Sequence, residues 1–365
     1  MIKSGKTICF FNSNTVWGGG EKWHYEFSLN LLKEGYKVFA VTNRKSDLFI
    51  KFQSTDISLL PIKIRNLSFL NPLKIIRLYQ FFKRNNIHLI ILGLSRDLKL
   101  GGIAAKLAGL NKILYRRGSA VPVKNSLTNR LLFKYILTGV IVNSLEIKRT
   151  LLLNNPNLIS INKIHLLYNC IDDLYLETTG KIISNIDKTA GEVLLGNVGR
   201  LVDQKGQNYL IDIAKILKDR NLKFKLLIAG KGHLESVLKE KAVTLGLDNY
   251  IRFLGFVPDI YSFMNKIDIF LFTSIHEGSA NVLLEAMVCS KPVVAFDISS
   301  ISEIVENNQT GFLAEFKNLK NFSDNVQRLI EDPDLRMQLG INGKRRIEDN
   351  FNVSKIMKEF KQIIE

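Results

Sequence analysis

The chain has 365 residues, of which 46% are hydrophobic and 23% charged, the balance of a globular protein with packed cores. At about 100–200 residues per domain, this length predicts two domains. No apolar run reaches the roughly 18 residues of a membrane span, so we expect no transmembrane helix. The opening residues, "MIKSGKTICF", lack the apolar stretch of a secretory signal. Cys9, Cys170 and Cys289 are too far apart for a metal or disulfide motif, which fits a reducing cytoplasm.

The net charge of +17 is unevenly distributed along the chain. Residues 1–180 contain 26 Lys and Arg against 10 Asp and Glu, a net charge of +16, and the remaining 185 residues contain 25 against 24, a net charge of +1. Such a field attracts anionic lipid head groups, nucleic acid or a phosphorylated substrate. A basic cytoplasmic proteome would explain the total charge, but it explains the one-sided distribution less well.

Short apolar runs alternate with helical patterns along the first half of the chain. Near-continuous apolar runs are typical of parallel strands that are covered on both faces. Helical periodicity lies between these runs, over residues 21–35 and 71–86. We therefore expect strands within residues 6–13, 37–42, 87–94, 112–118 and 139–144.

The second half repeats this alternation after a polar stretch, residues 176–192, which is our candidate linker. The repeated strand and helix pattern predicts two doubly wound parallel sheets. Near the end of the chain, Asp332-Pro333-Asp334 has the spacing of a metal-binding pair, but it fits a helix start better, with Asp332 as the N-cap. Strands are expected within residues 192–199, 224–232, 251–256, 267–274 and 291–297.

Gly18, Gly19 and Gly20 lie between the first expected strand and a helix that we expect to begin near Glu21. Ligands of open α/β sheets bind at the carboxyl ends of strands, and glycines let the backbone approach a ligand beside a helix N-terminus. A tight turn without a ligand would need the same residues. The fingerprint Gly-x-Gly-x-x-Gly is absent and no acid follows the second strand, which disfavours a nicotinamide-dependent dehydrogenase, although Arg44 leaves an NADP-dependent form open.

Arg200 and Lys205 follow the first expected strand of the second half. Two cations five residues apart at the mouth of a sheet can clamp a diphosphate, because arginine grips it bidentately and lysine acts as a point charge. From the spacing alone, two exposed cations in a loop are an equally good interpretation.

Glu277 and Glu285 stand eight positions apart in "HEGSANVLLEAM", around a strand-to-helix turn. Glu277 lies on the turn, and Glu285 lies about two turns into a helix that we expect to begin near Ser279. A carboxylate among apolar neighbours is costly unless it is hydrogen-bonded. A sugar diol would supply that bond, while the helix N-terminus would meet a phosphate. The alternative, a surface glutamate and a helix glutamate paired with a lysine, does not explain their placement around this turn.

Five stretches of the second half, between about residues 194 and 313, resemble the retaining glycosyltransferases of family 4, the glycosyl transferases group 1. They read "GNVGRLVDQKG", "LLIAGKGHL", "IRFLGFVPDI", "DIFLFTSIHEGSANVLLEAM" and "KPVVAFDISSISEIVENNQTGFL". The Glu-x7-Glu element from Glu277 to Glu285 is this family's hallmark. The first half is similar more loosely, at "GGGEKW", "VIVNS" and "YNCID".

The resemblance implies an α/β protein with the GT-B fold, in which two doubly wound Rossmann-like domains present parallel sheets across a cleft. It implies an acceptor-binding domain over residues 1–178, a nucleotide-sugar-binding domain over residues 190–348, and a C-terminal helix, about residues 350–365, packed back on the first domain. The implied activity is a hexosyltransferase that retains the anomeric configuration, with no metal and no cofactor. The leaving phosphate would take the acceptor proton, and UDP is expected as the base by family frequency alone.

The resemblance also implies roles for single residues. Catalysis would depend on Glu277, Arg200 and Lys205: the two cations would hold the donor diphosphate and Glu277 would contact hydroxyls of the donor sugar. This clamp would stabilise the negative charge that develops as the glycosidic bond breaks. Glu285 would bind the ribose. Further donor contacts are implied for Gly19, Gly20, Arg117, Gly230, Gly278, Ser279, Ala280, Asn281 and Val282.

Two positions depart from the family pattern. Many members have a histidine near the donor sugar where this sequence reads "YRRGSA". Arg117 would take over there, either by gripping phosphate or by binding an acidic acceptor. Cys170 stands where the family often has glycine, and we interpret it as a tolerated small residue.

The first domain, which binds the acceptor in this fold, also carries the excess positive charge. Leu73, Ile76, Tyr79 and Phe82 recur there among lysines and arginines, and basic amphipathic helices lie on anionic membranes. A helix that covers the sheet with its basic face in water is the alternative. We therefore predict a peripheral enzyme on the inner, cytoplasmic face of the membrane that extends a lipid-linked or lipopolysaccharide-type glycan.

Other functions stay open at this point. A sugar-nucleotide epimerase has a related fold but fits the Glu-x7-Glu context poorly. A catalytically idle subunit that scaffolds glycan assembly is disfavoured, because all the expected donor residues are present. Nucleic-acid binding would rest on charge alone, since the sequence contains no recognition module, so we expect no nucleic-acid partner.

Overall fold

The computed structural model describes residues 6–171, 189–278 and 280–365. The chain divides into two compact units: unit 1 contains the residues up to Asn169 together with Ile356–Glu365, and unit 2 contains Cys170–Lys355. Of the predicted linker, only residues 189–192 lie within the described residues, and the predicted end of the first domain at residue 178 lies outside them. Each unit is described by itself.

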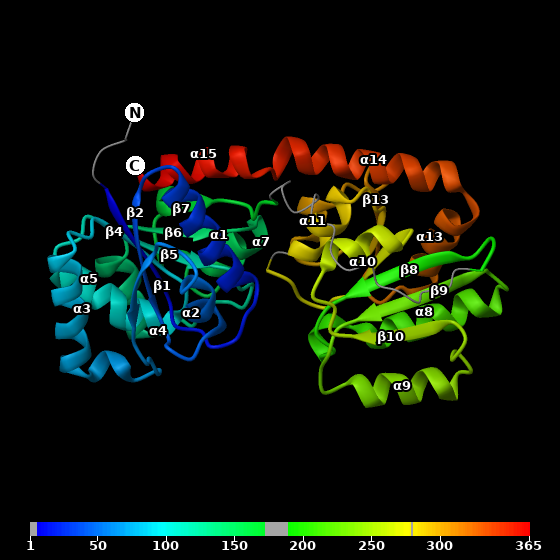
Figure 1. Cartoon of the computed structure of the whole chain (residues 1–365), viewed down its shortest axis with the longest axis horizontal. Helices are drawn as coiled ribbons and strands as arrows, with labels where there is room; N and C mark the ends of the chain where they lie inside the picture. The colour runs from blue at the N-terminus through cyan, green and yellow to red at the C-terminus, as the bar shows by residue number, and fades with distance from the viewer. Residues whose placement is uncertain (1–5, 172–188, 279) are drawn as a thin grey trace. The chain divides into compact units, whose positions relative to one another are not determined.

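Unit 1 is built on a seven-stranded sheet with the strand order β3-β2-β1-β4-β5-β6-β7 (Figure 1). The described pairings are parallel; Phe10 of β1, for example, lies between Ala40 of β2 and Ile91 of β4. The central strands are fully buried because both faces of a parallel sheet are covered. The strands are β1 (Thr7–Asn12), β2 (Lys37–Thr42), β3 (Ser58–Pro61), β4 (Leu89–Leu92), β5 (Lys112–Arg117), β6 (Gly139–Val142) and β7 (Ile164–Leu166).

Helices cover both faces of this sheet, because alternate side chains of a strand point to opposite faces. Phe11 belongs to the core formed with α3 and α5. Phe10 packs instead on Trp23 of α1, which stacks on Phe27 and meets Phe360 edge-on, so residues 356–365 complete the α1 face. The helices are α1 (Gly19–Lys33), α2 (Asp47–Phe52), α3 (Pro72–Arg84), α4 (Ser95–Asp97), α5 (Ile103–Leu107), α6 (Leu127–Leu131), α7 (Leu145–Leu152) and, shared with unit 2 at its start, α15 (Val353–Ile364).

The predicted apolar stripe on α3 is divided between two faces. Leu73, Ile76 and Tyr79 are exposed, at 75%, 49% and 37%, whereas Phe82 is buried in the core with Leu78. A helix turns by about 100° per residue, so each step of three residues drifts by about 60°, and position 82 ends on the side opposite position 73. Including Phe82 in the exposed stripe was therefore wrong.

Unit 2 is built on a six-stranded parallel sheet with the strand order β10-β9-β8-β11-β12-β13. On one face, residues of β8 and β9 form a core with α8 and α13. On the other face, Gly196 of β8 leaves room for Phe263 and Ile267, which a Cβ at position 196 would crowd, so α10 packs directly on the strand (Figure 1). The strands are β8 (Val193–Val198), β9 (Phe224–Ala229), β10 (Ile251–Gly255), β11 (Ile269–Phe272), β12 (Val293–Phe296) and β13 (Gly311–Ala314).

The last helices of unit 2 include the start that the sequence predicts at Asp332. The Asp332 side chain accepts a hydrogen bond from the Leu335 amide at 2.9 Å, and Pro333 is the first helical residue, which confirms the predicted cap. The helices of unit 2 are α8 (Gln207–Asp219), α9 (Glu235–Thr244), α10 (Ile260–Lys266), α11 (Asn281–Val288), α12 (Ile301–Ile304), α13 (Leu319–Glu331) and α14 (Pro333–Asn350).

The chain order reverses once within each sheet, which confirms two doubly wound parallel sheets. In unit 1 the chain moves outward from β1 to β3 and then, in the other direction, from β4 to β7; in unit 2 it moves from β8 to β10 and then from β11 to β13. Crevices at such switch points, outside the carboxyl ends of the strands, are where doubly wound sheets bind ligands. Among the described residues, none of the helices has the length and apolar character needed to cross a bilayer.

Candidate functional site

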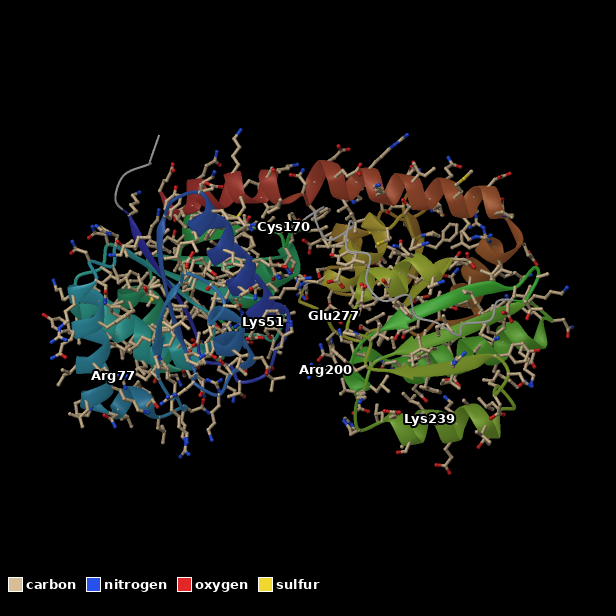
Figure 2. All side chains as sticks on the ribbon, viewed as in Figure 1. Lys51, Arg77, Cys170, Arg200, Lys239 and Glu277 are labelled. Atoms are coloured by element: carbon tan, nitrogen blue, oxygen red, sulfur yellow. The ribbon has the colours of Figure 1, made fainter. Side chains whose placement is uncertain are left out.

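Arg200, Lys205 and Glu277 lie around the switch point of unit 2. Arg200 and Lys205 follow β8, and Glu277 follows β11, which pairs with β8. Figure 2 shows Arg200 and Glu277 at the same end of unit 2. The topology of the sheet, rather than nearness in sequence, therefore brings these three side chains to one edge.

The loop after β8 is fixed to the loop after β9 by backbone contacts. The Gly199 amide donates to the Ala229 carbonyl at 3.0 Å, and the Leu201 amide donates to the Lys231 carbonyl at 3.0 Å. Gly230 has a φ of +144°, and a Cβ there would overlap the carbonyl oxygen of Gly199. Gly230, which the resemblance assigns to donor binding, thus has a structural role as well, because only glycine allows this approach.

A second glycine joins the loop after β8 to the end of β11. Gly206 closes the turn η6 (Asp203–Lys205) with a φ of +62°, and a Cβ there would overlap the carbonyl oxygen of Thr273. The Ile275 amide donates to the Gln204 carbonyl at 2.8 Å, and Gln204 Nε2 donates to the His276 carbonyl at 2.8 Å. These hydrogen bonds and this close approach therefore fix the loop that carries Lys205 against the loop that carries Glu277.

Lys205 and Glu277 form an ion pair, which the sequence did not reveal. Lys205 Nζ lies 2.6 Å from Glu277 Oε1, and their side chains are 20% and 9% exposed. The same Nζ lies 5.9 Å from the centre of the Phe272 ring, so Lys205 is held from two sides. Arg200 is exposed by contrast; its carbonyl accepts a hydrogen bond from Gln207 Nε2 at 3.0 Å, which fixes the loop without engaging the guanidinium. One fixed and one exposed cation thus follow the strands at the switch point of unit 2.

Helix α11 follows the Glu277 turn and begins at Asn281, two residues after the predicted start. Ala280, a buried residue, takes the N-cap position, and its side chain makes no capping bond to the helix. The turn is fixed by a hydrogen bond from Ser300 Oγ to the Gly278 carbonyl at 3.2 Å. Ser279, one of the expected donor contacts, lies outside the described residues. The amides at the start of α11, including that of Val282, thus lie beside the Glu277 turn, where a helix end favours an anion.

Glu285 lies on the second turn of α11, and the helix around it is buried. It is 9% exposed, between the fully buried Leu284 and Ala286. The strong burial of this helix makes a carboxylate there costly unless polar groups compensate it. Glu277 thus lies just before α11 and Glu285 within it. The Lys205–Glu277 ion pair lies at the N-terminal end of the helix.

The expected donor residues Gly19 and Gly20 belong to unit 1, where they form the first turn of α1. The helix begins at Gly19, two residues earlier than predicted, and Gly18 makes no side-chain cap. Glu21 is buried and accepts a hydrogen bond from Asn12 Nδ2 at 3.0 Å, which ties the start of α1 to the end of β1. Gly19 and Gly20 therefore lie inside the helix rather than in the turn before it.

Arg116 and Arg117 lie on opposite faces of β5. Arg116 is 5% exposed, stacks 5.2 Å from the Trp23 ring centre and lies close to Gly20, where a Cβ would be 3.6 Å from its Nη1. Arg117 lines a cavity on the other face. The arginine beside the helical turn formed by Gly19 and Gly20, called the glycine turn below, is therefore Arg116, which the sequence analysis did not single out. Side chains alternate between the two faces of a strand, so positions 116 and 117 could have been told apart.

A buried polar network surrounds Arg116. Its Nη2 donates to Asn169 Oδ1 at 3.2 Å, while its Nε is buried and has no partner among the described residues. Burial lowers the pKa of Arg116 to about 10, against the opposing effect of Glu21. Burial also lowers the pKa of His24 to about 3, so this histidine is neutral at physiological pH. Its Nδ1 lies 2.9 Å from the Gly20 carbonyl, which positions the histidine against the glycine turn.

No group of three or more His, Cys, Asp or Glu residues suited to holding a metal ion occurs among residues 6–171, 189–278 and 280–365. Cys9 is buried, and burial raises the pKa of its thiol. Burial raises the pKa of the Cys289 thiol to about 11. Both thiols therefore stay protonated at neutral pH, when they are weak nucleophiles.

Comparison with known proteins matches residues 180–346 to the family model described as glycosyl transferases group 1. A capsular polysaccharide biosynthesis glycosyltransferase, CapM of Staphylococcus aureus, is 31% identical over 171 residues, which is 47% of this chain and 45% of that protein. The N-acetylgalactosamine-N,N'-diacetylbacillosaminyl-diphospho-undecaprenol 4-alpha-N-acetylgalactosaminyltransferase of Campylobacter jejuni subsp. jejuni serotype O:2 is 34% identical over 193 residues, 52% of this chain and 50% of that protein. The matches thus span about half the length of these curated relatives.

The whole chain is similar in structure to HepE of Anabaena, solved in complex with UDP and glucose. The two chains superpose with a TM-score of 0.84 at 22% sequence identity, covering 99% of each. HepE has also been solved in complex with UDP-glucose, with a TM-score of 0.82. This likeness confirms the predicted GT-B fold.

Proposed function

Because residues 180–346 place this chain in the glycosyl transferases group 1 family, we propose that it transfers a sugar from a nucleotide-sugar donor to a hydroxyl group of a glycan. The observation that carries the proposal is the Lys205–Glu277 ion pair at the switch point of unit 2, beside the start of α11. This arrangement offers a cation to a diphosphate and a carboxylate to sugar hydroxyls at one edge of the sheet.

The donor we propose is a UDP-hexose. HepE, whose fold this chain shares, has been solved with UDP and with UDP-glucose. In this chain Arg200 and Lys205 would bind the diphosphate, and the amides at the start of α11 would add N–H donors. Glu277 would bind hydroxyls of the sugar and Glu285 those of the ribose. A screen of UDP-, GDP- and ADP-sugars identifies the base.

The reaction we propose retains the anomeric configuration and needs no metal. The bond between the anomeric carbon and the phosphate oxygen breaks, the acceptor oxygen bonds to the same face of that carbon, and the acceptor proton passes to the leaving phosphate. Negative charge then grows on the diphosphate, where Arg200 and Lys205 would stabilise it. Donors that are fixed before reaction stabilise such charge without reorganising during it.

The acceptor we propose is a lipid-linked or cell-surface glycan, reached from the cytoplasmic face of a membrane. The Campylobacter relative is named for a diphospho-undecaprenol substrate, and CapM for capsular polysaccharide. Unit 1 adds its own support: an exposed apolar row runs from the turn before α3 along that helix, flanked by exposed Arg77, Lys83 and Arg84. No acid occurs between Asp56 and Asp97. The row consists of Leu67, Leu70, Leu73, Ile76 and Tyr79.

The activity is tested by incubating the full chain with UDP-, GDP- and ADP-sugars and measuring nucleotide release, with and without EDTA. We expect slow hydrolysis of one donor, unchanged by EDTA, and a higher thermal midpoint with the matching nucleotide. A ligand at a hundredfold its dissociation constant adds about 2.7 kcal/mol of apparent stability. Release that stops with EDTA would exclude the metal-free reaction. Nucleotide binding without any release or transfer would favour the idle scaffolding subunit instead.

A further inference from the structure

Unit 1 contains a cavity of about 360 Å³ on the face of β5 that carries Tyr115 and Arg117. Its walls come from the segment after β4, the end of β5, the loop that follows β5, and the helical turns around Phe133. Ligand pockets typically enclose about 300–1,000 Å³, so the cavity has room for a small group such as one phosphorylated sugar. It lies wholly within unit 1 and contains none of the residues around the Lys205–Glu277 pair of unit 2.

The cavity is lined by Lys99, Arg117 and Lys124 and by no acidic side chain. Asp97 is the acid nearest in sequence, but its carboxylate is used elsewhere: it accepts hydrogen bonds from Ser13 Oγ at 2.5 Å and from the Leu94 amide at 3.1 Å. Three cations without a lining carboxylate create a positive potential, which low-dielectric walls strengthen. The charge of this cavity therefore favours a multiply charged anion.

Arg117 has hydrogen-bonding capacity left for such an anion. One of its terminal nitrogens, Nη2, donates to the Val121 carbonyl. Its Nε is buried and has no partner among the described residues. A guanidinium carries five N–H donors in a planar fork that matches two oxygens of a phosphate. A phosphate in the cavity would accept hydrogen bonds from the terminal N–H groups of Arg117 that the Val121 carbonyl does not use.

The remaining lining suits a sugar attached to that phosphate. Leu98, Val123 and Phe133 are buried apolar residues of the wall. Phe133 packs edge-on against Tyr115, with ring centres 6.2 Å apart, and gives the wall a rigid apolar surface. The uncharged polar residues of the lining are Ser95, Ser119, Ser126, Thr128 and Asn129. Hydroxyl and amide groups beside apolar surface are the usual composition of a pocket for a small polar ligand.

We propose that this cavity binds a phosphate group of the acceptor, with Lys99, Arg117 and Lys124 holding its charge. That the phosphate belongs to the acceptor rests on the proposed function, whereas the binding of a phosphate by this cavity does not. The proposal moves Arg117 from the donor to the acceptor and leaves the donor to unit 2 and the glycine turn. The same phosphate chemistry occurs in a soluble sugar phosphate and in the head group of a polyprenyl phosphate in a membrane.

The test uses the full chain, saturated with UDP, and follows unfolding by tryptophan fluorescence. Trp17 and Trp23 are the chain's two tryptophans and both belong to unit 1, so the signal reports on the unit that contains the cavity. The probes are glucose 1-phosphate against glucose, and phosphatidylcholine vesicles with against without polyprenyl phosphate. We expect a phosphorylated probe to raise the unfolding midpoint, and its affinity to fall by at least about tenfold in Lys99→Met and in Lys124→Ala, since each loses a charge-assisted contact.

Lys106→Ala is the matched control, because Lys106 is an exposed lysine of unit 1 on α5, outside the cavity lining. Loss confined to Lys99→Met and Lys124→Ala supports the proposal, and the arm that responds identifies a soluble or a membrane-bound phosphate. No response to either phosphorylated probe, or an equal response in all the variants, overturns it. Nucleotide release measured in the same samples separates the two hypotheses. Release without phosphate binding refutes only phosphate binding by the cavity. Phosphate binding without nucleotide binding or release refutes only the proposed transferase activity.

Discussion

Lys205 Nζ and Glu277 Oε1 lie 2.6 Å apart at the switch point of unit 2, so the cation and the carboxylate expected to grip opposite parts of a donor also hold each other. The carboxylate keeps Lys205 in place before any ligand arrives, and it lowers the cost of burying the ammonium. When a diphosphate binds, it must share the lysine with Glu277. We infer that diphosphate binding and sugar binding are energetically coupled through this pair.

A double-mutant cycle measures that coupling. We expect Lys205→Ala to lower kcat for donor cleavage by about 10²–10³, because it removes a positive charge where negative charge develops. Glu277→Gln keeps the volume of the side chain but frees Lys205 from its partner, and we expect a loss of similar size. Residues that act as a unit are not additive, so the double variant should lose far less than the product of the single losses. Steady-state nucleotide release gives each rate.

Lys239 offers a matched control on α9, away from the Lys205–Glu277 pair (Figure 2). It forms an ion pair with Glu235 at 2.7 Å, with the lysine side chain 51% exposed. Exposed pairs of this kind contribute little, so Lys239→Ala should leave nucleotide release unchanged. Strict additivity of the Lys205 and Glu277 variants would contradict the coupling and leave them as two independent contacts.

Gly206 is the position at which the loop carrying Lys205 is most sensitive to substitution. Gly206→Ala places a Cβ against the Thr273 carbonyl in a backbone with φ of +62°, whereas Gly246→Ala meets only the flexible end of Lys218, 3.1 Å away, at φ of +61°. Backbone strain costs about 1 kcal/mol in both, and overpacking adds about 1–3 kcal/mol in the first alone. Urea unfolding by circular dichroism measures the loss, with tryptophan fluorescence as an internal reference for unit 1.

Gly206→Ala should also weaken nucleotide binding, because the strained turn carries Lys205. Gly246→Ala, on the loop before β10, should not. Equal destabilisation by the two substitutions would show that the turn can shift away from Thr273, and that Gly206 does not hold the two loops together.

The fold was predictable where strands are buried and continuous, and less so at the edges. β1, β4, β8 and β11 lie within long apolar runs, because both of their faces are covered. β3, β7 and β13 were not predicted. β3 has four residues, is partly exposed and ends in Pro61, and β7 has three residues. β3 and β7 bury few side chains, so they leave little hydrophobic pattern to read. β13 is mostly buried, but its four residues are too few to show an alternation.

The candidate site was predictable as a set of residues but not as a set of contacts. Arg200, Lys205 and Glu277 could be named because they follow strands, where α/β proteins bind ligands. The ion pair joins positions 72 apart and exists because β8 and β11 are neighbours at the switch point. Propensity and periodicity are local, so they do not carry strand order. The position of Arg116 beside Gly20 was missed for a simpler reason: side chains alternate between the two faces of β5, so only one of Arg116 and Arg117 can face α1.

His24 and Asp97 give unit 1 two buried groups with opposite effects on its pH dependence. Burial lowers the pKa of His24 from 6.5 to about 3, so the folded state resists its protonation and stability falls as pH drops below about 6.5. Burial raises the pKa of Asp97 from 3.8 to about 7, so the folded state keeps this proton and stability falls as pH rises from about 3.8 to 7. Between roughly pH 4 and 6.5 the two slopes oppose each other.

Single substitutions should separate these slopes. Asp97→Asn leaves the His24 effect alone, so its stability relative to the wild type should rise with pH by up to about 1.4 kcal/mol per unit between roughly pH 4 and 6.5. His24→Gln leaves the Asp97 effect alone, and its relative stability should fall with pH over the same range. Urea titrations followed by tryptophan fluorescence report on unit 1 and measure both. Variants whose stability stays parallel to the wild type at every pH would show that neither group titrates as the burial implies.

The exposed apolar row of unit 1 predicts binding to anionic membranes. Leu73 and Ile76 are 75% and 49% exposed, so Leu73→Glu combined with Ile76→Glu should leave the unfolding midpoint nearly unchanged. It should nevertheless lower sedimentation with phosphatidylglycerol vesicles by at least about tenfold, because two inserted side chains are lost and two negative charges are added. Val237→Glu, at a 56% exposed position of unit 2, is the matched control and should bind as the wild type does.

Lys83→Gln with Arg84→Gln should weaken membrane binding in a salt-dependent manner, at about 1 kcal/mol per cation. Equal binding of the wild type to phosphatidylcholine and phosphatidylglycerol vesicles would contradict the role of charge, and full binding by the Leu73 and Ile76 variant would exclude the row itself as the contact.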